Sequence, residues 1–465
     1  MHGVVIAGTH SGCGKTIMTL GILAALREKG YKVQAFKAGP DFIDSGLHKL
    51  VTEKPSRNLD LWMCGGDYVV ECFRRQSADV DVAVIEGVMG LYDGKPSTAE
   101  LAGLLGLPVI LVVDAYGMAE SAGAVVRGFY EDTRCKMQNA KLMGVIFNRV
   151  ASERHYERLK RGVRDIPVLG YLPRDLRFRI PERHLGLMVA EEAPISQENI
   201  QRLADTVLKY IDIDWITRCR IQDWKNHASC IMHRESLTHP ICIAVAYDKA
   251  FCFYYEDNLD LLRSSAEIVL FSPLSDEGVP HRADVIYIGG GYPELYAPLL
   301  SKNESMLRSI HAWAKSGKPI YAECGGLMYL SKGIYYNPPT PFNKGEYYAM
   351  AGVFPFETQI PPYPPLLKGC RGGLRPHLGY REILLKEDCI LGKEGDKLRG
   401  HEFHYSEIIS KPLSLPTSYS VKNGLGRDIG DEGYRIKNTL ASYIHIHFGS
   451  NPHITRNFIN FLKEG

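Results

Sequence analysis

The sequence lacks a long apolar run, paired cysteines at metal-binding or redox spacing, and an excess of charge of either sign. No stretch reaches the roughly 18 consecutive apolar residues that a transmembrane helix requires. The 11 cysteines are an odd number without a C-x-x-C pair, which disfavours a disulfide framework and a zinc module. A net charge of +2 supplies no basic surplus for nucleic acid. We therefore expect a globular, cytoplasmic protein that binds neither nucleic acid nor a membrane.

The chain is longer than the length at which a single hydrophobic core keeps growing, so two domains are expected. It has 465 residues, of which 45% are hydrophobic, so each domain has material for a substantial core. Between residues 215 and 239 the sequence contains two Trp, scattered His and charged residues, and no regular period. We predict a first domain at 1–215, a linker at 216–239 and a second domain at 240–465.

Short apolar runs bounded by Gly, Asp or Asn indicate buried parallel strands in both halves. These runs lie at residues 4–7, 33–37, 82–86, 109–113 and 145–148, and again at 241–247, 268–271, 285–288 and 319–322. Helical patterns alternate with them at 17–29, 120–130, 257–264 and 304–315. The alternation predicts an α/β fold, with a doubly wound first domain and a second α/β domain, and ligands at the carboxyl ends of the strands.

The segment GTHSGCGKT at residues 8–16 follows the first predicted strand and precedes a helix, as a phosphate-binding loop does. Its glycines let backbone N–H groups converge on phosphate oxygens at a helix N-terminus. Thr9 replaces the first glycine of the common pattern, and the segment instead resembles the phosphate loop of dethiobiotin synthetase. A glycine-rich turn with a chance Lys-Thr pair is the alternative. The candidate nucleotide-binding residues are Gly8, Thr9, Gly12, Gly14, Lys15, Thr16 and Lys37.

Acidic residues near the ends of neighbouring strands are candidate magnesium ligands. Asp41 follows the second predicted strand and Glu86 ends the third, so both should lie on the phosphate-loop side of the sheet. With the hydroxyl of Thr16 they form the predicted Mg²⁺ site for bound ATP. Lys37 is expected to neutralise the transferred phosphoryl group. Solvated loop carboxylates are the alternative, which has more weight for Asp44 than for Glu86 because Glu86 ends an apolar run.

Cys324 lies in AECGGL at residues 322–327, between a short apolar strand and a helical stretch. This pattern is typical of a nucleophile elbow, in which a sharp turn exposes the thiol and a helix N-terminus favours the thiolate. A buried structural cysteine is the alternative. Oxyanion donors are expected from Gly325 and from Gly290 and Gly291, which follow the strand predicted at 285–288.

The base that activates a cysteine nucleophile is a His that can lie far away in sequence. The C-terminal segment offers His445 and His447, two residues apart, which would face the same side of an extended strand. His401 and His404 are further candidates, for which a structural role is equally plausible.

Eight segments in chain order together resemble the family of cobyrinate a,c-diamide synthases, whose close relatives are the Ni-sirohydrochlorin a,c-diamide synthases. The segments lie at residues 8–16, 37–44, 55–60, 84–87, 289–294, 323–327, 401–406 and 441–448, so the resemblance covers nearly the whole chain. It implies a dethiobiotin synthetase-like P-loop domain and a class I glutamine amidotransferase-like domain. It also implies ATP and Mg²⁺ as cofactors, and L-glutamine and a carboxylate-rich tetrapyrrole as substrates.

The same resemblance implies Cys324 as the nucleophile and favours His445 over His447 as its activator. Ordinary class I glutaminases have His-x-Glu where this chain has two His, so no third triad acid is evident, and Glu323 and Glu402 are guesses. Within residues 55–60, Arg57 and Asp60 are candidate substrate-binding residues together with Asp44, although a plain structural loop is equally plausible.

We expect ATP to activate a carboxylate as an acyl phosphate, which is then amidated with ammonia released from glutamine. Residues 90–101 resemble the cobyrinate enzymes more than the nickel enzymes, whose reaction is an alternative, as are cobyric acid synthase-like amidation and amidation of a non-tetrapyrrole acid. A ParA/MinD-like regulatory ATPase with a decayed glutaminase half is disfavoured by the presence of both Cys324 and His445. A homodimer is left open.

Overall fold

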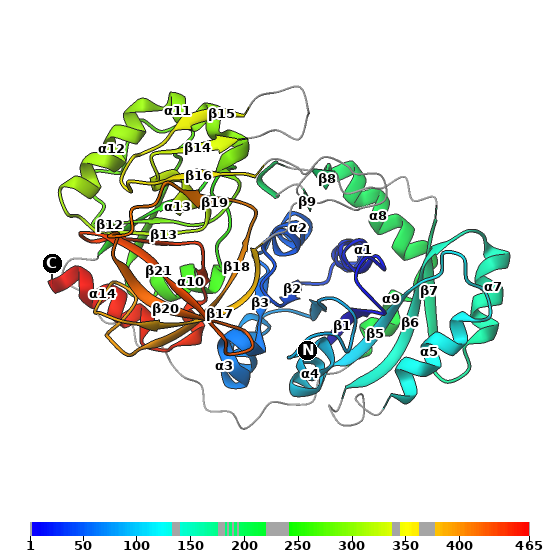
Figure 1. Ribbon diagram of the computed structural model, residues 1–465. Coiled ribbons are helices and arrows are strands. Elements are labelled where there is room, and N and C mark those ends of the chain that lie inside the picture. The colour runs from blue at the N-terminus through cyan, green and yellow to red at the C-terminus, as the bar shows by residue number, and fades with distance from the viewer. Residues whose placement is uncertain are drawn as a thin grey trace. The chain divides into compact units, whose positions relative to one another are not determined.

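The computed structural model describes residues 2–132, 140–174, 182–183, 186–187, 190–192, 195–219, 241–336, 345–361 and 377–464. The chain divides into two compact units, residues 1–231 and 232–465, each with its own central sheet (Figure 1). Residues 220–240, with most of the linker predicted at 216–239, lie outside the described residues. The predicted domain boundaries therefore stay a prediction.

The first unit is built on a sheet of seven parallel strands in the order β3-β2-β4-β1-β5-β6-β7. Its strands are apolar and buried along most of their length, as expected for a parallel sheet with both faces covered. The strands are β1 (His2–Gly8), β2 (Val33–Ala38), β3 (Arg57–Leu59), β4 (Val82–Glu86), β5 (Pro108–Asp114), β6 (Lys141–Val150) and β7 (Val168–Pro173).

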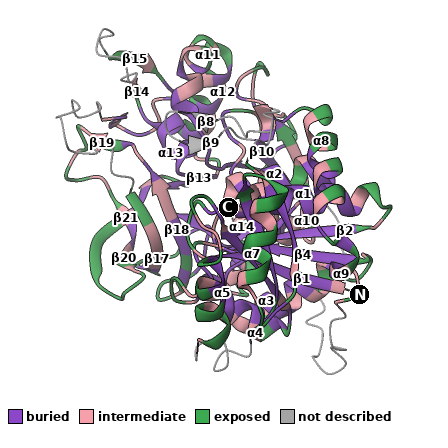
Figure 2. Cartoon of the chain, turned by 90° about the vertical axis from the view of Figure 1, so that its right-hand side faces the viewer, coloured by how far each residue is buried: buried purple, intermediate pink, exposed green. Residues whose placement is uncertain are grey.

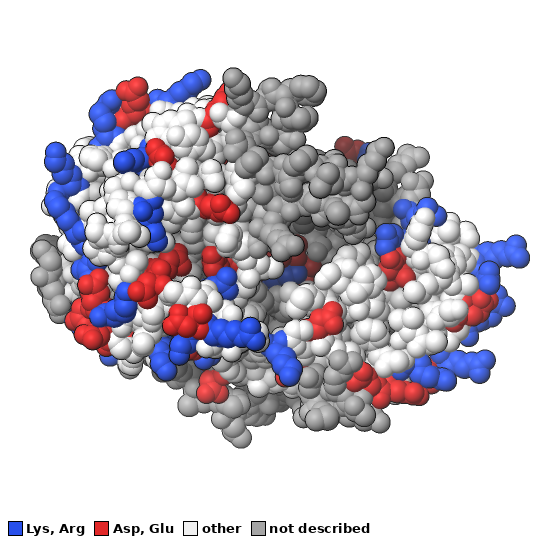
Figure 3. Space-filling model, in the orientation of Figure 1, with Lys and Arg blue, Asp and Glu red and all other residues white. Residues whose placement is uncertain are grey.

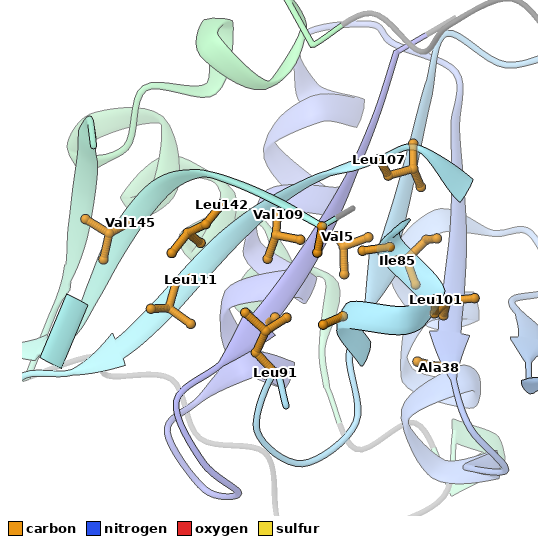
Figure 4. Close-up of a cluster of buried hydrophobic side chains, with 14 of the residues drawn as sticks. Val5, Ala38, Ile85, Leu91, Leu101, Leu107, Val109, Leu111, Leu142 and Val145 are labelled. Atoms are coloured by element: carbon orange, nitrogen blue, oxygen red, sulfur yellow. The ribbon is translucent and has the colours of Figure 1, made fainter. Parts of the chain in front are cut away.

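Helices cover both faces of this sheet. Successive residues of β1 point to opposite faces, and both sets are apolar, so each face needs a covering layer. Val5, labelled in Figure 4, and Ala7 pack into one core, while Val4 and Ile6 pack into the other. The first core is covered by α3 (Leu61–Gln76), α4 (Thr98–Leu105), α5 (Ala122–Glu131) and α7 (Glu153–Gly162). The second is covered by α1 (Lys15–Glu28), α2 (Phe42–Thr52), α8 (Gln197–Tyr210) and α9 (Ile213–Ile216). The described part of this unit also contains β8 (Glu182–Arg183), β9 (Gly186–Leu187) and the 3₁₀ helix η1 (Ala190–Glu192).

The second unit has a mixed ten-stranded sheet in the order β11-β10-β12-β13-β22-β21-β20-β17-β18-β23. The strands from β11 to β22 pair in parallel, and those from β22 to β23 pair antiparallel. Its strands are β10 (Cys242–Ala246), β11 (Glu267–Phe271), β12 (Val285–Ile288), β13 (Ile320–Glu323), β17 (His377–Leu385), β18 (Lys397–His404), β20 (Thr417–Asn423), β21 (Asp428–Ile436), β22 (Thr439–Ser442) and β23 (His445–Ile446). A smaller sheet pairs β15 (Glu346–Ala349), β14 (Gly333–Tyr336), β16 (Glu357–Gln359) and β19 (Glu407–Ile409) in that order.

Two cores lie on opposite faces of the ten-stranded sheet, as the alternation along β10 shows. Ala244 belongs to one core and Val245 to the other. The first core includes residues of α11 (Ala297–Lys302), α12 (Glu304–Lys315) and α13 (Gly325–Leu330), and the second those of α10 (Glu256–Arg263) and α14 (Ile454–Glu464). The 3₁₀ helices are η2 (Pro293–Tyr296) and η3 (Phe448–Ser450). In Figure 2 the central strands of each unit are mostly buried, while exposed residues lie on the surrounding helices and on β17, β20 and β21.

Each predicted strand coincides with an observed one, and the predicted α/β class is confirmed for both units. The antiparallel strands β17 to β21 are absent from the predictions because many of their residues are exposed or half-buried, which leaves no clean apolar run. One local expectation is wrong: His445 and His447 do not share a strand. β23 ends at Ile446, and His447 instead precedes η3 as its N-cap.

Candidate active sites

The loop between β1 and α1 has the backbone conformation that its glycines predict. Gly12 and Gly14 have φ values of 82° and 94°, in the left-handed region that disfavours other residues. A side chain at Gly14 would in addition overlap the amide of Asn148, whose Nδ2 donates a hydrogen bond to the carbonyl of Cys13 at 2.9 Å. In the sequence, Asn148 is recognisable only as the last residue of a predicted strand, which does not by itself predict its contact with the loop. The loop is thereby held open at the N-terminus of α1, where backbone N–H groups favour an anion.

Lys15 lies at the start of α1 and folds back over this loop. Its Nζ donates a hydrogen bond to the carbonyl oxygen of His10 at 3.3 Å, and the residue is only 8% exposed. Burial lowers the pKa of Lys15, because the charged ammonium has lost water. An anion in the loop would restore favourable interactions to this ammonium, so the arrangement suits phosphate binding.

Four side chains from four elements meet beside the loop. The hydroxyl of Thr16 donates to Glu86 Oε1 at 2.8 Å and lies 3.4 Å from Asp44 Oδ1. Lys37 Nζ donates to the same Oε1 at 3.0 Å and forms a short contact with Asp44 Oδ2. On its other side, Glu86 Oε2 is 2.7 Å from His48 Nε2. His48, on α2, is a residue that the sequence analysis did not single out.

The charged groups of this cluster are buried, and Lys37 is paired with both Asp44 and Glu86. Burial opposes ionisation of Glu86, but Lys37 and His48 outweigh it and lower the Glu86 pKa below its usual range. Burial also opposes the charge of Lys37, but Asp44 and Glu86 outweigh it and raise the Lys37 pKa. Asp44 has a raised pKa because it is buried and lies near the charges of Glu86 in the cluster and of Asp41 at the start of α2. A divalent cation would relieve this crowding of carboxylates.

Asp41 does not join this cluster as predicted. It is the N-cap of α2, and its Oδ1 accepts the backbone N–H of Asp44 at 2.9 Å. Asp44, whose alternative was a solvated loop carboxylate, is instead 7% exposed and contacts Thr16 and Lys37. The oxygen donors that meet beside the loop are therefore those of Thr16, Asp44 and Glu86.

Residues 55–60 have a structural role. Asp60 is the N-cap of α3, where its side chain accepts the N–H of Met63 at 2.8 Å. Arg57 is 7% exposed in the edge strand β3. Between them, Asn58 donates to the carbonyls of Gly39 and Asp41 and so holds the loop that leads to Asp44.

In the second unit, Cys324 joins β13 to α13 with a φ of 49° and a ψ of −103°. A non-glycine residue with positive φ is strained, and such strain is found at nucleophile elbows. Its N–H donates to the carbonyl of Ser442 at 2.7 Å, and its Sγ lies 3.9 Å from the carbonyl of Phe403. A side chain at the following Gly325 would approach Pro293 Cδ to 2.9 Å, which explains the small residue there.

The glycines after β12 take two different positions. The N–H of Gly290 donates to the carbonyl of Phe253 at 3.2 Å, so this donor is already engaged. Gly291 has a φ of 154°, and its nitrogen lies 3.1 Å from the position that a Cβ on Gly325 would occupy. Of the predicted oxyanion donors, Gly291 and Gly325 are therefore brought to the cysteine elbow.

His445 is buried beside this elbow. A side chain on Gly290 would overlap its Cε1 and lie 3.1 Å from its Nε2, so the ring packs directly against the glycine loop. The ring stacks on that of His401 with centroids 5.0 Å apart, and the hydroxyl of Tyr255 lies 2.5 Å from His401 Nδ1. His447 accepts the N–H of Gly449 through Nδ1 at 3.0 Å. This geometry gives His447 a structural role and leaves His445 as the candidate base.

Burial keeps the thiol and the imidazole uncharged. It raises the pKa of Cys324 above its usual range, an effect to which the charge of Glu294 adds and which the N–H of Gly325 opposes. Burial, together with the nearby His404, lowers the pKa of His445 to about 3. Burial therefore favours a neutral thiol and a neutral imidazole at the elbow.

Within the described residues, one group of His, Cys, Asp and Glu side chains has the spacing of metal ligands, namely His377, Glu402 and His404. Its carboxylate is already engaged on both oxygens, because Oε1 lies 2.7 Å from His404 Nε2 and Oε2 accepts Arg381 Nε at 2.5 Å. The adjacent guanidinium would repel a cation, so the group is an ion-pair network that supports β17 and β18.

No helix in the described part of the chain is both long enough and apolar enough to cross a bilayer. On the face drawn in Figure 3, acidic and basic side chains are interspersed over the described residues.

Two protein families match the two units. Residues 4–187 match the family described as the CobQ/CobB/MinD/ParA nucleotide binding domain, and residues 242–453 match the CobB/CobQ-like glutamine amidotransferase domain. Three relatives named cobyrinate a,c-diamide synthase are similar over nearly the full length. The protein of Syntrophotalea carbinolica is 40% identical over 99% of this chain and 98% of its own. For Caldanaerobacter subterraneus subsp. tengcongensis the values are 40%, 95% and 94%, and for Dehalococcoides mccartyi 41%, 99% and 98%.

Proposed function

This chain belongs to the cobyrinate a,c-diamide synthase family, and we propose that it amidates the a and c acetate carboxylates of cobyrinate in cobalamin biosynthesis. It is a glutamine-hydrolysing carbon–nitrogen ligase that uses ATP, with glutamine or ammonia as the nitrogen donor. All three of these relatives carry the cobyrinate name, which does not favour the Ni-sirohydrochlorin or cobyric acid alternatives.

One observation carries the proposal: a single chain contains both a phosphate loop with an oxygen-rich cluster and a strained cysteine beside a buried His. The first prepares an electrophile from a carboxylate, and the second releases ammonia from an amide. Neither site alone makes a carboxamide from a free acid, glutamine and ATP.

At the phosphate loop, a substrate carboxylate oxygen attacks the γ-phosphorus of ATP, and ADP leaves. We assign Lys15 to the terminal phosphates and Lys37 to the charge of the transferred phosphoryl group. Thr16, Asp44 and Glu86 supply the hydroxyl and carboxylate oxygens that Mg²⁺ prefers, and bound Mg²⁺ would offset phosphate charge there. Ammonia then attacks the acyl carbon, phosphate leaves with the proton that the nitrogen loses, and a carboxamide remains. A second cycle on the other acetate gives the diamide.

At the elbow, the Cys324 thiol gives its proton to His445 as its sulfur attacks the side-chain amide carbon of glutamine. The N–H groups of Gly291 and Gly325 are assigned to the developing oxyanion. The His445 proton passes to the leaving nitrogen, which departs as ammonia and leaves a thioester on the cysteine. Water then hydrolyses the thioester to glutamate and restores the thiol.

The cellular setting follows from the same chemistry. The cysteines in the described residues are all free thiols, which suits a reducing compartment, so we place the protein in the cytoplasm. Association into a homodimer is a further proposal, which light scattering of the purified protein would test.

The decisive experiment is mass spectrometry of the product formed with ATP, glutamine and cobyrinic acid. We expect two successive mass changes, each equal to the exchange of a hydroxyl for an amino group. Parallel incubation with Ni-sirohydrochlorin is the control. Amidation of the nickel compound in place of cobyrinic acid would contradict the proposed substrate.

A further inference from the structure

We propose that Glu323 is the positioning residue for His445, the third group that the His-x-His sequence seemed to lack. The inference rests on the proposed glutaminase function of Cys324. Glu323 Oε2 lies 3.9 Å from His445 Nδ1, and both side chains are about 1 to 2% exposed. Glu323 directly precedes Cys324, so one strand, β13, delivers both the nucleophile and the acid.

The Glu323 carboxylate is fixed in place by three donors. Tyr321 donates its hydroxyl to Oε1 at 2.6 Å, and the N–H of Ile446 donates to the same oxygen at 3.0 Å. Tyr287 donates its hydroxyl to Oε2 at 3.0 Å. Ile446 is the residue next to His445, so the carboxylate is attached to the backbone that carries the imidazole. A separation of 3.9 Å is longer than a hydrogen bond, but catalytic hydrogen bonds are often long before substrate binds and shorten in the complex.

Two half-buried carboxylates nearby, Glu402 and Glu432, are committed elsewhere. Glu402 is held by His404 and Arg381. Glu432 accepts the N–H of Tyr443 at 2.6 Å and the hydroxyl of Ser442 at 3.1 Å. Glu323 is the acid that the structure places against Nδ1 of His445.

The position defines what the carboxylate does. By holding a proton on Nδ1, it leaves the lone pair on Nε2, the nitrogen on the side of the ring that packs against Gly290. When the thiol proton moves to Nε2, the imidazole becomes a cation, and the adjacent carboxylate stabilises it. No covalent bond forms at Glu323.

The groups that face His445 set the pH dependence. They are Glu323 on β13 and His401 on β18, and the charged forms of Glu402 and His404 on β18 also act on the imidazole. Burial raises the pKa of Glu323 to about 7, although the hydrogen bonds from Tyr321, Ile446 and Tyr287 oppose the shift. An acid with a raised pKa is ionised only above that value, so support for the imidazolium is present above about pH 7 and is lost as the pH falls through it.

The test compares Glu323→Gln with Glu432→Gln in the full-length protein. Both remove one carboxylate of the same unit whose pKa burial raises to about 7, but only Glu323 lies against His445. We expect Glu323→Gln to lower glutamine-driven amidation by about 10²–10⁴-fold, as loss of a triad acid does, while ammonia-driven amidation is retained. Glu323→Asp should recover part of the loss. In the wild type, the rate of Cys324 alkylation by iodoacetamide should change with pH near pH 7. This change should disappear in Glu323→Gln and remain in Glu432→Gln.

If Glu323→Gln does not fold, Tyr287→Phe and Tyr321→Phe take its place, each keeping the carboxylate but removing one of its donors. Each should lower the glutamine-driven rate by about 10-fold or more, without changing the ammonia-driven rate. Wild-type glutamine-driven rates in these variants, or an equal loss in Glu432→Gln, would overturn the assignment. Cys324→Ser distinguishes a failure of this assignment from a failure of the proposed function. If Cys324→Ser keeps glutamine-driven activity, the proposed glutaminase site is wrong. If Cys324→Ser loses that activity while the Glu323 and tyrosine variants keep it, only the role of Glu323 is wrong.

Discussion

At the phosphate loop of the first unit, Lys15, Lys37, Asp44 and Glu86 bring charges of both signs to one edge of a parallel sheet. At the cysteine elbow of the second unit, burial instead favours a neutral thiol and a neutral imidazole. Both sites use the same backbone device, a tight turn from the end of a parallel strand into a helix N-terminus. The same strand-to-helix turn therefore occurs at a charged site in one unit and at a neutral site in the other.

The difference follows from what each site must receive. A site for ATP has to compensate several negative charges, so fixed cations and metal-binding carboxylates are needed before the ligand arrives. Paired in advance, these buried charges stabilise one another and limit the free energy lost through desolvation. The side-chain amide that glutamine brings to the cysteine is uncharged, so charge at the reacting atoms develops only during the reaction. A neutral Cys324 thiol beside a neutral His445 imidazole avoids the free-energy cost of an unpaired thiolate in a buried site.

The largest effect should come from Cys324→Ser. Without the thiol, no thioester forms, and glutamine-driven amidation should fall by at least about 10⁴-fold. Ammonia-driven amidation should be retained, because the phosphate loop is unchanged. Amide formation with each nitrogen source is the measurement, and Cys389→Ser, another buried cysteine of the same unit, is the matched control. Equal retention of both activities would contradict the nucleophile.

Lys15→Ala should act in the opposite pattern. Carboxylate activation precedes the step that uses ammonia, so both glutamine-driven and ammonia-driven amidation should fall, by about 10³-fold. The same two assays measure it, with Lys160→Ala on the exposed side of α7 as the control. A variant that lost only the glutamine-driven reaction would break the separation of roles between the two units.

Gly290→Ala should have a smaller and more selective effect. The added methyl group would overlap His445 Cε1, so the buried ring must shift. A displacement of this kind lowers a rate by about 10²-fold, and we expect that loss only with glutamine. Gly278→Ala, where the nearest neighbour of the new Cβ is Ser309 Oγ at 3.2 Å, should leave both rates near wild type. An unchanged glutamine-driven rate in Gly290→Ala would argue against His445 as the base.

The smallest expected effect is on the free energy of unfolding, and its pH dependence above pH 4.5 should differ between the two units. Burial, aided by the charge of Glu402, raises the pKa of Glu432 to about 7 from 4.5, so the folded state holds this proton to a higher pH than the unfolded chain. Its contribution to the free energy of unfolding therefore falls as the pH rises from 4.5 to 7. Relative to Glu432→Gln, wild type should lose about 2 kcal/mol between about pH 5.5 and 8.

Glu86 in the first unit supplies the contrast. Its pKa is lowered, so its contribution is fully present above the unfolded value of 4.5 and is lost only as the pH falls below it. The difference between wild type and Glu86→Gln should therefore be constant over the range in which the Glu432 difference changes. Denaturant titrations followed by hydrogen exchange in each unit would measure both, and a parallel pH trend in the two pairs would contradict the electrostatic contrast.

Much of this molecule could be predicted from its sequence, because the informative signals are local. The loop at residues 8–16 and the elbow at Cys324 each need glycines within a few positions of the reactive group, and buried parallel strands are continuous apolar runs. Helix and strand order, the two α/β units and the residues at the strand ends follow from such patterns.

Only the tertiary structure decided which distant side chains meet. It assigned Asp41 to a helix cap and brought Asp44 to Thr16, although the two carboxylates are only three residues apart. It also carried Glu323 to His445 across a long sequence separation, through the pairing of β13 with β22, a strand that the apolar pattern did not predict. Sequence fixes local backbone preference, whereas the partners of a buried charge depend on packing between elements, which no local pattern encodes.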